Sequence, residues 1–419
     1  MNAPDAATLD VHDPLAEFRA QFHVPPHGDG ECVYLCGNSL GLQPKRAARY
    51  LEEELDAWRR FGVEGHFRGQ RPWKDYHELF AAPLAALAGA HEHEVVCMNG
   101  LTVNLHLLMV SFFRPTTSRY KLLIERSAFP SDRYAVVSQL RHHGLDPADA
   151  LIEVGRRAGE THLRDADIAA AIREAGGALA MVLLPGVQYL SGEALDIAML
   201  TAEAHAVGAI AGWDLAHAIG NLPLALHDAD ADFAAWCSYK YLNGGPGAVA
   251  GAFVHERHGN DASVPRFAGW WGHDKAARFR MAPDFNAMPG ADGWQLSNPP
   301  VLGMAPLLAS LELFTAAGMA KLRAKSVALT ALLERRLDEV LADEVTILTP
   351  RDAARRGCQL SLRVRDGAAA GRAAFARLGT AGVVCDWREP DVIRVAPVPL
   401  YNRFADIERF VAVLQEALQ

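Results

Sequence analysis

Cysteine is scarce in this 419-residue sequence, and none of its six cysteines belongs to a C-x-x-C pair. Cys32 and Cys36 have a spacing that zinc ligands can adopt, but no second pair of Cys or His follows them, so no metal site is predicted. Scattered cysteines in a long chain are typical of reduced thiols in the cytoplasm. The sequence therefore predicts a cytoplasmic protein.

Long hydrophobic runs and an excess of basic residues are also missing. No stretch of 18 apolar residues occurs, so no membrane-spanning helix is predicted. The first ten residues, MNAPDAATLD, are acidic and lack an apolar centre, so no signal peptide is expected. The formal net charge of -9 argues against nucleic acid or an anionic membrane as a main partner. With 50% hydrophobic and 22% charged residues, the composition is that of a globular protein.

The pattern of the chain changes near residue 300. Before that point short apolar strands alternate with helices, which predicts an α/β fold with a mostly parallel sheet covered on both faces. After it, two long helical stretches lead into short strands and helices, which predicts a small α+β domain. We expect residues 1–60 to form an N-terminal segment packing with the small domain, 61–300 the large domain, and 301–419 the small C-terminal domain. The expected strands cover residues 94–98, 120–125, 178–184, 209–213, 232–237, 248–254, 345–348, 359–364, 383–386 and 392–395, and the expected helices 44–60, 74–89, 102–113, 132–143, 196–207, 299–314, 319–341, 369–378 and 405–418.

An aspartate and a lysine follow two successive predicted strands. Asp214 ends the apolar run 209–213, where a carboxylate is costly to bury unless it meets a cation or hydrogen-bond donors. Lys240 follows the strand 232–237 and precedes the Gly-rich segment 243–247, where loss of solvent makes an amine nucleophilic. A cofactor that acts as an electron sink needs both, Lys for a covalent bond to its aldehyde and Asp for its pyridinium nitrogen. Taken singly, each has a simpler explanation, Asp214 as an N-cap and Lys240 as a solvated loop residue.

Two further strand-to-helix junctions carry groups suited to ligand binding. Gly100 and Thr102 offer free backbone N–H groups and a hydroxyl to a phosphate. Phe129 is suited to stacking on a flat ring, and Asp132 to capping the helix or accepting from a ring hydroxyl. Plain helix capping at the first junction, and a hydrophobic staple at Phe129, explain the same residues without a ligand.

The segment GPGAVA, residues 245–250, matches the G-x-G-x-x-A dinucleotide fingerprint. That fingerprint requires a strand before the glycines and a helix after them, whereas here the glycines precede the predicted strand 248–254. Nicotinamide or flavin binding is therefore not expected.

Ten segments, in order along nearly the whole chain, resemble the kynureninases, which are pyridoxal-phosphate (PLP) hydrolases of the fold-type-I aminotransferase superfamily. They are GNSLG (37–41), RPW (71–73), NGLTVNLHLLMVSFF (99–113), AFPSD (128–132), DLAHAIGN (214–221), WCSYKYLN (236–243), GWWGH (269–273), SNPP (297–300), RGCQLS (356–361) and IRVAPVPLYN (393–402).

The resemblance implies a fold-type-I structure with a seven-stranded sheet in a large PLP-binding domain, and pyridoxal 5′-phosphate as the cofactor. Lys240 would bind the cofactor covalently, and Asp214 would pair with the pyridine nitrogen. Phe129 would stack on the ring, with Asp132 close by. The remaining residues implied to bind the cofactor are Leu101, Thr102 and Tyr239 at the phosphate, His217 near the ring oxygen or the substrate, and Pro130, Ser131, Trp270 and Asn298. Some members carry a Ser near the phosphate where this chain has Pro185, which leaves the role of Pro185 in doubt.

The resemblance also implies a kynurenine-type substrate. Arg394 would pair with its α-carboxylate through a planar fork, and Ser39 would lie beside the substrate. His66 and Asn298 fall where the aromatic ring should lie, and a His there can hydrogen-bond a ring hydroxyl, which favours acceptance of 3-hydroxykynurenine besides kynurenine. Trp270 and Asn298 resemble residues that reach the site from the other subunit, so a homodimer is implied.

The implied reaction is hydrolysis of the Cβ–Cγ bond to give anthranilate or 3-hydroxyanthranilate and L-alanine, in tryptophan degradation or the supply of NAD precursors. Tyr239 is the candidate acid near Cγ or Cβ. A PLP-dependent cysteine desulfurase or selenocysteine lyase is the alternative, with Cys358 as its nucleophile, although the alternation of Cys358, Leu360 and Leu362 predicts one buried face of a strand. A non-catalytic protein with the same fold is a third reading.

Overall fold

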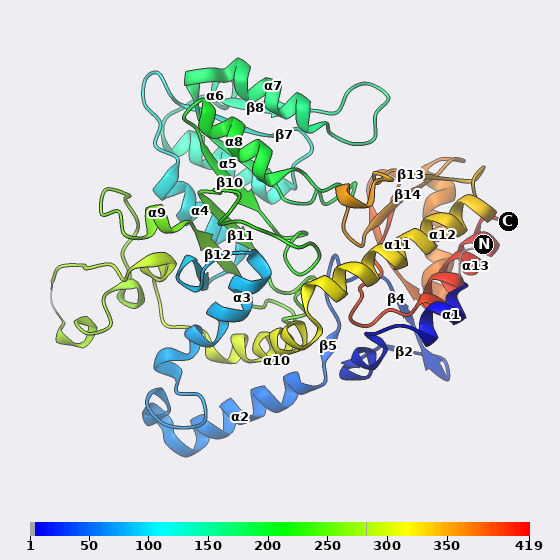
Figure 1. Cartoon of the computed structure of the whole chain (residues 1–419), viewed down its shortest axis with the longest axis horizontal. Helices are drawn as coiled ribbons and strands as arrows, with labels where there is room; N and C mark the ends of the chain where they lie inside the picture. Colours follow the sequence, from blue (N-terminus) through cyan, green and yellow to red (C-terminus); the bar gives the residue numbers. More distant parts are fainter. Residues whose placement is uncertain (1–4, 282) are drawn as a thin grey trace.

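The computed structural model describes residues 5–281 and 283–419. Residues 1–4 lie outside the described residues. They belong to the predicted N-terminal segment, and also to the acidic first ten residues in which no signal peptide is expected. A seven-stranded sheet forms the centre of the larger part (Figure 1). In spatial order its strands are β6 (Val95–Cys97), β12 (Gly251–Val254), β11 (Phe233–Trp236), β10 (Ile210–Asp214), β9 (Leu179–Pro185), β7 (Lys121–Glu125) and β8 (Leu151–Val154).

The sheet is mixed rather than purely parallel. Strands β11, β10, β9, β7 and β8 are paired in parallel, whereas β12 runs antiparallel to both β11 and β6. The predicted mostly parallel sheet is therefore confirmed, with one reversed strand. Because the five parallel strands point the same way, their carboxyl ends share one edge, where ligands bind in such sheets.

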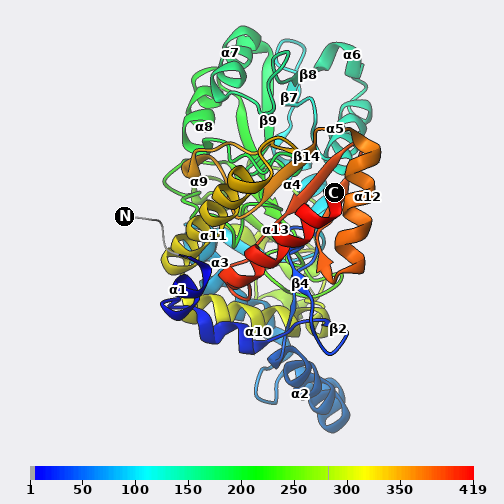
Figure 2. The ribbon, with the colours of Figure 1, turned by 90° about the vertical axis from the view of Figure 1, so that its right-hand side faces the viewer.

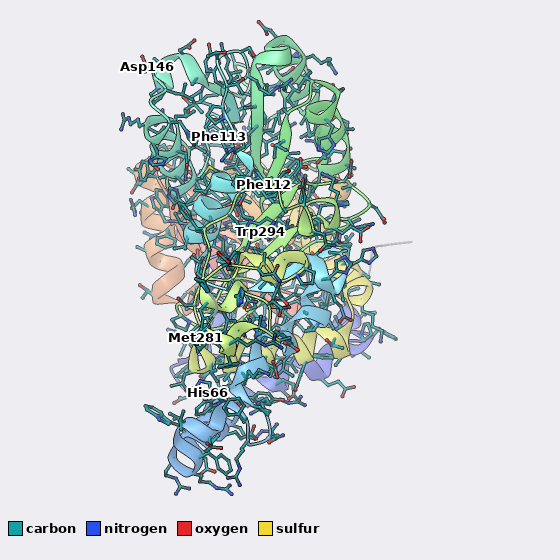
Figure 3. All side chains as sticks on the ribbon, turned by 90° about the vertical axis from the view of Figure 1, so that its left-hand side faces the viewer. His66, Phe112, Phe113, Asp146, Met281 and Trp294 are labelled. Carbon is teal, nitrogen blue, oxygen red and sulfur yellow. The ribbon has the colours of Figure 1, made fainter. Side chains whose placement is uncertain are left out.

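Helices cover both faces of this sheet. On one face, buried apolar side chains come from α3 (Ala81–Ala88), α7 (Asp165–Ala175), α8 (Ile197–Ala206) and α10 (Val301–Ala317). On the other they come from α4 (Leu101–Phe112) and α5 (Pro130–His142), where the rings of Phe112 and Trp294 stack with centroids 6.2 Å apart (Figure 3). Strand β8 and helix α7 were not expected from the sequence. β8 is a half-buried edge strand of four residues, which is too short for a clear periodic pattern.

The smaller part is built on a four-stranded antiparallel sheet, seen with its helices in Figure 2. Its strands, in spatial order, are β13 (Val345–Ile347), β14 (Leu360–Val364), β17 (Val392–Val395) and β16 (Asp386–Arg388), and its helices are α11 (Met319–Val340), α12 (Ala368–Thr380) and α13 (Phe404–Leu418). The single strand expected over 383–386 is divided. β15 (Val383–Val384) pairs with β4 (Val33–Tyr34) near the N-terminus, and the chain then joins the four-stranded sheet at Asp386.

Two buried cores meet along α11. Leu322 belongs to the core under the seven-stranded sheet, and Leu329 begins the core of the smaller part. The change from one core to the other therefore falls inside α11, later than the change in sequence pattern near residue 300. The small core also takes in Ala6 and Leu35 from the N-terminal region.

The remaining elements lie mostly near the N-terminus and at the surface. Helix α2 packs against α10 and projects below the sheet (Figures 1 and 2). These remaining α-helices and strands are α1 (Ala6–Val11), α2 (Arg46–Phe61), α6 (Pro147–Ala150) and α9 (Glu256–Gly259), and the strand pairs β1 (Phe22–His23) with β5 (Gln43–Pro44) and β2 (Pro26–His27) with β3 (Gly30–Glu31). Among the described residues, no helix taken singly has the length and apolar composition to cross a membrane, and α10 with α11 meet that test only as a pair bent by 83°.

Candidate active site

A cavity of about 340 Å³ opens at the carboxyl ends of the parallel strands. Strand β10 delivers Asp214 to it, and the loop after β11 delivers Lys240. Helices α4 and α5 reach it with their N-terminal turns. The residues singled out from the sequence that line this cavity are Gly100, Leu101, Thr102, Phe129, Ser131, Asp132, Pro185, Asp214, His217, Tyr239 and Lys240.

Three carboxyl groups line the cavity, and we call them the acidic group: Glu125, Asp132 and Asp214. Burial, followed by the negative charge of Asp214, raises the pKa of Asp132 well above its usual value. Burial also raises the pKa of Glu125, to about 7. Asp214 accepts a hydrogen bond from the backbone N–H of Ala216 (2.8 Å), as an N-cap would, but Oδ1 of Asp132 is buried without a partner among the described residues. The acidic group therefore has unused capacity to accept a hydrogen bond from a cationic donor.

Lys240 lies against a neutral histidine. Its Nζ is 2.9 Å from Nε2 of His217 and 5.8 Å from the centre of the Phe129 ring. Burial, with the positive charge of Lys240 second, lowers the pKa of His217 well below its usual value, so the imidazole is neutral and accepts from the lysine ammonium. Its other nitrogen, Nδ1, then carries the ring proton and has no partner among the described residues. One donor therefore remains available beside the lysine.

Two helix N-termini meet at the wall of the cavity. The hydroxyls of Thr102 and Ser131, in the first turns of α4 and α5, are 2.9 Å apart. The N-cap residues Gly100 and Phe129 offer no side-chain cap to either helix. Unsatisfied N–H groups and the positive ends of two helix dipoles thus face the same place, which suits a phosphate.

Arg394 and Ser39 lie beside the cavity rather than in its wall. Arg394 is 1% exposed, and its Nη1 donates to the backbone oxygen of Tyr189 (2.7 Å), a cavity-lining residue. Its Nη2 is 2.7 Å from Asp386 and 3.1 Å from the hydroxyl of Ser39, which also donates to Asp386. Asp386 therefore holds the fork of the guanidinium that the sequence assigns to a substrate carboxylate.

Three further predicted site residues, His66, Asn298 and Trp270, do not line the cavity of this chain. His66 and Asn298 line a second hollow of about 380 Å³, together with Trp58, Trp73 and Leu302. In Figure 3 His66 lies beside α2, well below Phe112 and Trp294 on the covered face of the sheet. Trp270 is 44% exposed at the surface.

The predicted residues also differ in how they meet the cavity. Tyr239 lines it, and burial raises the pKa of its hydroxyl above the usual value. Pro185, which the sequence left in doubt, lines it as well. Pro130 is the first residue of α5 and is not among the lining residues.

Sequence reasoning did not single out Glu125, Tyr189 or Asp386. Glu125 is a carboxylate at the end of a predicted apolar strand, which is the same sequence signal that singled out Asp214. Tyr189 had no such signal, because it reaches Arg394 from a loop 205 residues earlier in the chain. Asp386 lies opposite Arg394 on the neighbouring strand β16, a pairing that the single strand expected over 383–386 did not reveal.

Cys358, the nucleophile of the alternative reading, is fully buried, and burial raises the pKa of its thiol to about 12. It lies just before β14, where its backbone N–H donates to Asn221 (2.9 Å). A reactive cysteine needs an accessible thiolate, so this side chain is unsuited to that role.

Comparison with known proteins agrees with the features of this site. Residues 322–414 match the family described as the kynureninase C-terminal domain. The chain is 57% identical over 411 residues to a kynureninase of Myxococcus xanthus, covering 98% of this chain and 96% of the relative. It is 55% identical over 407 residues to a kynureninase of Koribacter versatilis, covering 97% and 95%.

Solved structures of similar fold are more distant in sequence. An apo cysteine desulfurase from Thermococcus onnurineus superposes with a TM-score of 0.76 at 17% identity, covering 100% of this chain and 99% of that one. A structure of C-DES with glycine covalently linked to its PLP cofactor gives a TM-score of 0.78 at 19% identity, covering 95% and 99%. These likenesses establish the fold-type-I architecture alone.

Proposed function

Since the chain belongs to the kynureninase family, we propose that it hydrolyses the Cβ–Cγ bond of L-kynurenine, and of 3-hydroxy-L-kynurenine, with pyridoxal 5′-phosphate as its cofactor. Water supplies a hydroxyl to the acyl carbon and a hydrogen to Cβ, so the products are anthranilate, or 3-hydroxyanthranilate, and L-alanine. The observation that carries the proposal is the meeting of Lys240, the neutral His217 and the acidic group in one cavity.

The residues present fit this cofactor. The cavity volume lies within the range of ligand sites, and the acidic group with its unpaired Asp132 oxygen suits a protonated ring nitrogen. Thr102, Ser131 and the two helix N-termini suit the phosphate. Phe129 is placed to cover a flat ring, and Lys240 to bond the aldehyde. When bound, the cofactor supplies an electron sink for carbanions formed at the substrate.

Proton transfers fall to Lys240 and Tyr239. We assign the free amine of Lys240 as the base that takes the substrate Cα proton, because His217 holds that nitrogen in place at 2.9 Å. The raised pKa of Tyr239 keeps its hydroxyl protonated at neutral pH. It is therefore suited to donate a proton to a strongly basic carbon such as Cβ, and unsuited to act as a base.

Arg394 would bind the substrate α-carboxylate. Its guanidinium is already oriented by Tyr189 and Asp386, so the arginine is preorganised rather than mobile. The substrate carboxylate then takes the place of part of the Asp386 contact, and Ser39 donates to whichever carboxylate is present.

A homodimer completes the site in this proposal. Trp270 and Asn298 lie outside the cavity of their own chain, and His66 and Asn298 share an apolar hollow at the surface. Phe267 and Phe279, which are exposed apolar side chains close to Trp270 in the sequence, support burial of this region against a second copy. Each copy would thereby supply its Trp270, Asn298 and His66 to the other copy's cavity.

A cytoplasmic location is part of the same proposal. All six cysteines are free, and five of them are buried, which suits a reducing compartment.

The experiment is a competition between substrates. The PLP-loaded protein is mixed with equal amounts of L-kynurenine and 3-hydroxy-L-kynurenine, and anthranilate, 3-hydroxyanthranilate and alanine are quantified. We expect the amount of alanine to equal that of the two aromatic products together. In a separate assay with L-cysteine as the substrate, we expect no sulfide. Lys240→Ala should abolish turnover. If the protein binds the cofactor but forms neither aromatic product, the proposed substrate is wrong and only the proposed cofactor stands.

The same assay tests specificity. His66→Trp replaces a ring nitrogen able to bond a hydroxyl by a bulkier ring, so its preference should move toward kynurenine. An unchanged product ratio would remove His66 from the substrate site.

A further inference from the structure

Away from the cavity, three potential metal ligands converge from two distant parts of the chain. His91 and Glu94 immediately precede β6, and His227 lies in the loop between β10 and β11, 133 residues beyond Glu94. One ligand atom from each of these three side chains lies within 4.8 Å of the others. We call these residues the His–Glu–His cluster.

The spacing within the cluster suits a small divalent cation. Nδ1 of His227 is 3.0 and 3.1 Å from the two carboxylate oxygens of Glu94, and the rings of His91 and His227 have centroids 4.2 Å apart. Two ligands of a tetrahedral zinc ion, each bonded at about 2.0–2.1 Å, lie roughly 3.3 Å from each other. Small rotations of the two imidazoles therefore bring all three donors to one ion.

The carboxylate is held as a ligand would be held. Glu94 is fully buried, and its oxygens accept the backbone N–H groups of His91 (2.9 Å) and Glu256 (2.7 Å). Such outer hydrogen bonds fix the orientation of metal-binding carboxylates. The ring of His255 stacks on that of His227 at 4.9 Å and limits its rotation. The anionic ligand and one imidazole are thus preorganised.

The cluster is also accessible. His91 is exposed and His227 half-buried, so an ion can enter from solvent and keep a water as a fourth ligand. His93 and Glu256, whose side chains are 3.0 Å apart at the surface, lie next to it and supply a second ion-attracting pair.

We propose that the His–Glu–His cluster binds one divalent first-row metal ion, with zinc as the best match to two imidazoles and one carboxylate. The ion joins the segment that leads into β6 to the loop before β11. The chain runs from Glu94 through β6 to the start of α4, which lines the cavity. The ion therefore acts as a structural link at the end of β6 that is farther from the cavity. The metal takes no part in the proposed reaction.

The experiment titrates the metal-free holoenzyme, prepared without a histidine tag, with Zn²⁺ against a chromophoric chelator. We expect one tightly bound ion per chain and a rise in melting temperature on its addition. His91→Ala and His227→Ala should each weaken this binding by at least about tenfold, because losing even an outer contact of a zinc site costs that much. His142→Ala, in an exposed histidine pair of α5, is the matched control and should bind as the unaltered protein does.

Co²⁺ gives a second measurement that does not depend on stability. A bound cobalt ion in a site of low coordination number should show visible absorption bands that disappear in His91→Ala, an exposed position that tolerates substitution. Absence of stoichiometric binding, or binding that survives both cluster substitutions, would show that Glu94 and His227 form only an ion pair. Equal loss in His142→Ala would show non-specific binding to surface histidines.

Discussion

Buried carboxyl groups decide the charge of the cavity. Burial is the main cause of the raised pKa values of Asp132 and Glu125, and the negative charge of Asp214 raises both further. Lys240 also lines the cavity, and its positive charge acts in the opposite direction on the pKa of Asp132. Ionising a buried carboxyl group near another negative charge is unfavourable, and a cationic ligand reduces this free-energy cost. The acidic group therefore favours a protonated nitrogen over a neutral one.

Replacing Glu125 by Gln tests this cost through the pH dependence of stability. The folded-state pKa of about 7 lies above the ordinary glutamate value of 4.5, so between these values the folded protein holds a proton that the unfolded chain has released. Stability therefore falls as pH rises from 4.5 to 7, by up to about 3 kcal/mol.

Glu125→Gln should consequently raise the melting temperature at pH 8 and leave it nearly unchanged below pH 5. Thermal unfolding at the two pH values measures the effect. Glu52→Gln, at an exposed position on α2, serves as the control and should show no such dependence. An equal shift at both pH values would contradict the buried-acid explanation.

Asp214 is expected to contribute most of the affinity for a ring cation. Removing one partner of a buried charge pair costs about 2–5 kcal/mol, so Asp214→Asn should weaken PLP binding by roughly 30-fold or more. Equilibrium dialysis or fluorescence titration of the cofactor measures this directly. Asp261→Asn, in a surface loop, is the control. Unchanged affinity would mean that Asp214 caps the turn at Ala216 and does nothing more.

The helices α4 and α5 act as a pair because their first turns are held together. The contact between Thr102 and Ser131 places two helix N-termini at one point of the cavity. Together the two N-termini offer more unsatisfied N–H groups to a phosphate than either helix does alone.

The double variant Thr102→Ala and Ser131→Ala should weaken cofactor binding by about 100-fold or more, because each of the two hydrogen bonds to a charged group contributes ~1.5–3 kcal/mol. Inorganic phosphate should also compete less effectively with PLP in this variant. Ser138→Ala, further along α5 where the hydroxyl bonds the Ala135 backbone oxygen, is the matched control. Equal losses in both variants would indicate damage to the helix rather than to a phosphate site.

In the proposed dimer, Lys240 and Asn298 of one active site come from different copies. Lys240→Ala and Asn298→Ala should then be nearly inactive separately, whereas subunit exchange between them should restore about a quarter of the sites, because half of the dimers become mixed and each mixed dimer carries one intact site. Activity after mixing, with light scattering to confirm the dimer, measures this. If mixing restores nothing while exchange is demonstrated, both residues serve the same copy's site.

Features of the fold that depend on residues close together in the sequence were predictable, and those that depend on distant partners were not. Alternating strands and helices, the sheet edge that carries Asp214 and the loop that carries Lys240 are local features, and they were predictable because apolar periodicity and strand ends depend on neighbouring residues. The edge strand β8 and the division at Cys385 were not, since four-residue and two-residue strands are defined by their partners.

The sequence by itself determined the α/β class, the segments that carry chemistry and, through ten matched segments, the family. Only the tertiary structure decided which side chains meet: Asp132 with Asp214, Ser39 with Arg394, and Glu94 with His227. It also placed Asn298 and His66 outside the cavity of their own chain. The physical reason is that charge pairing and burial act through space, so residues far apart in the chain acquire partners only when the strands and helices have packed.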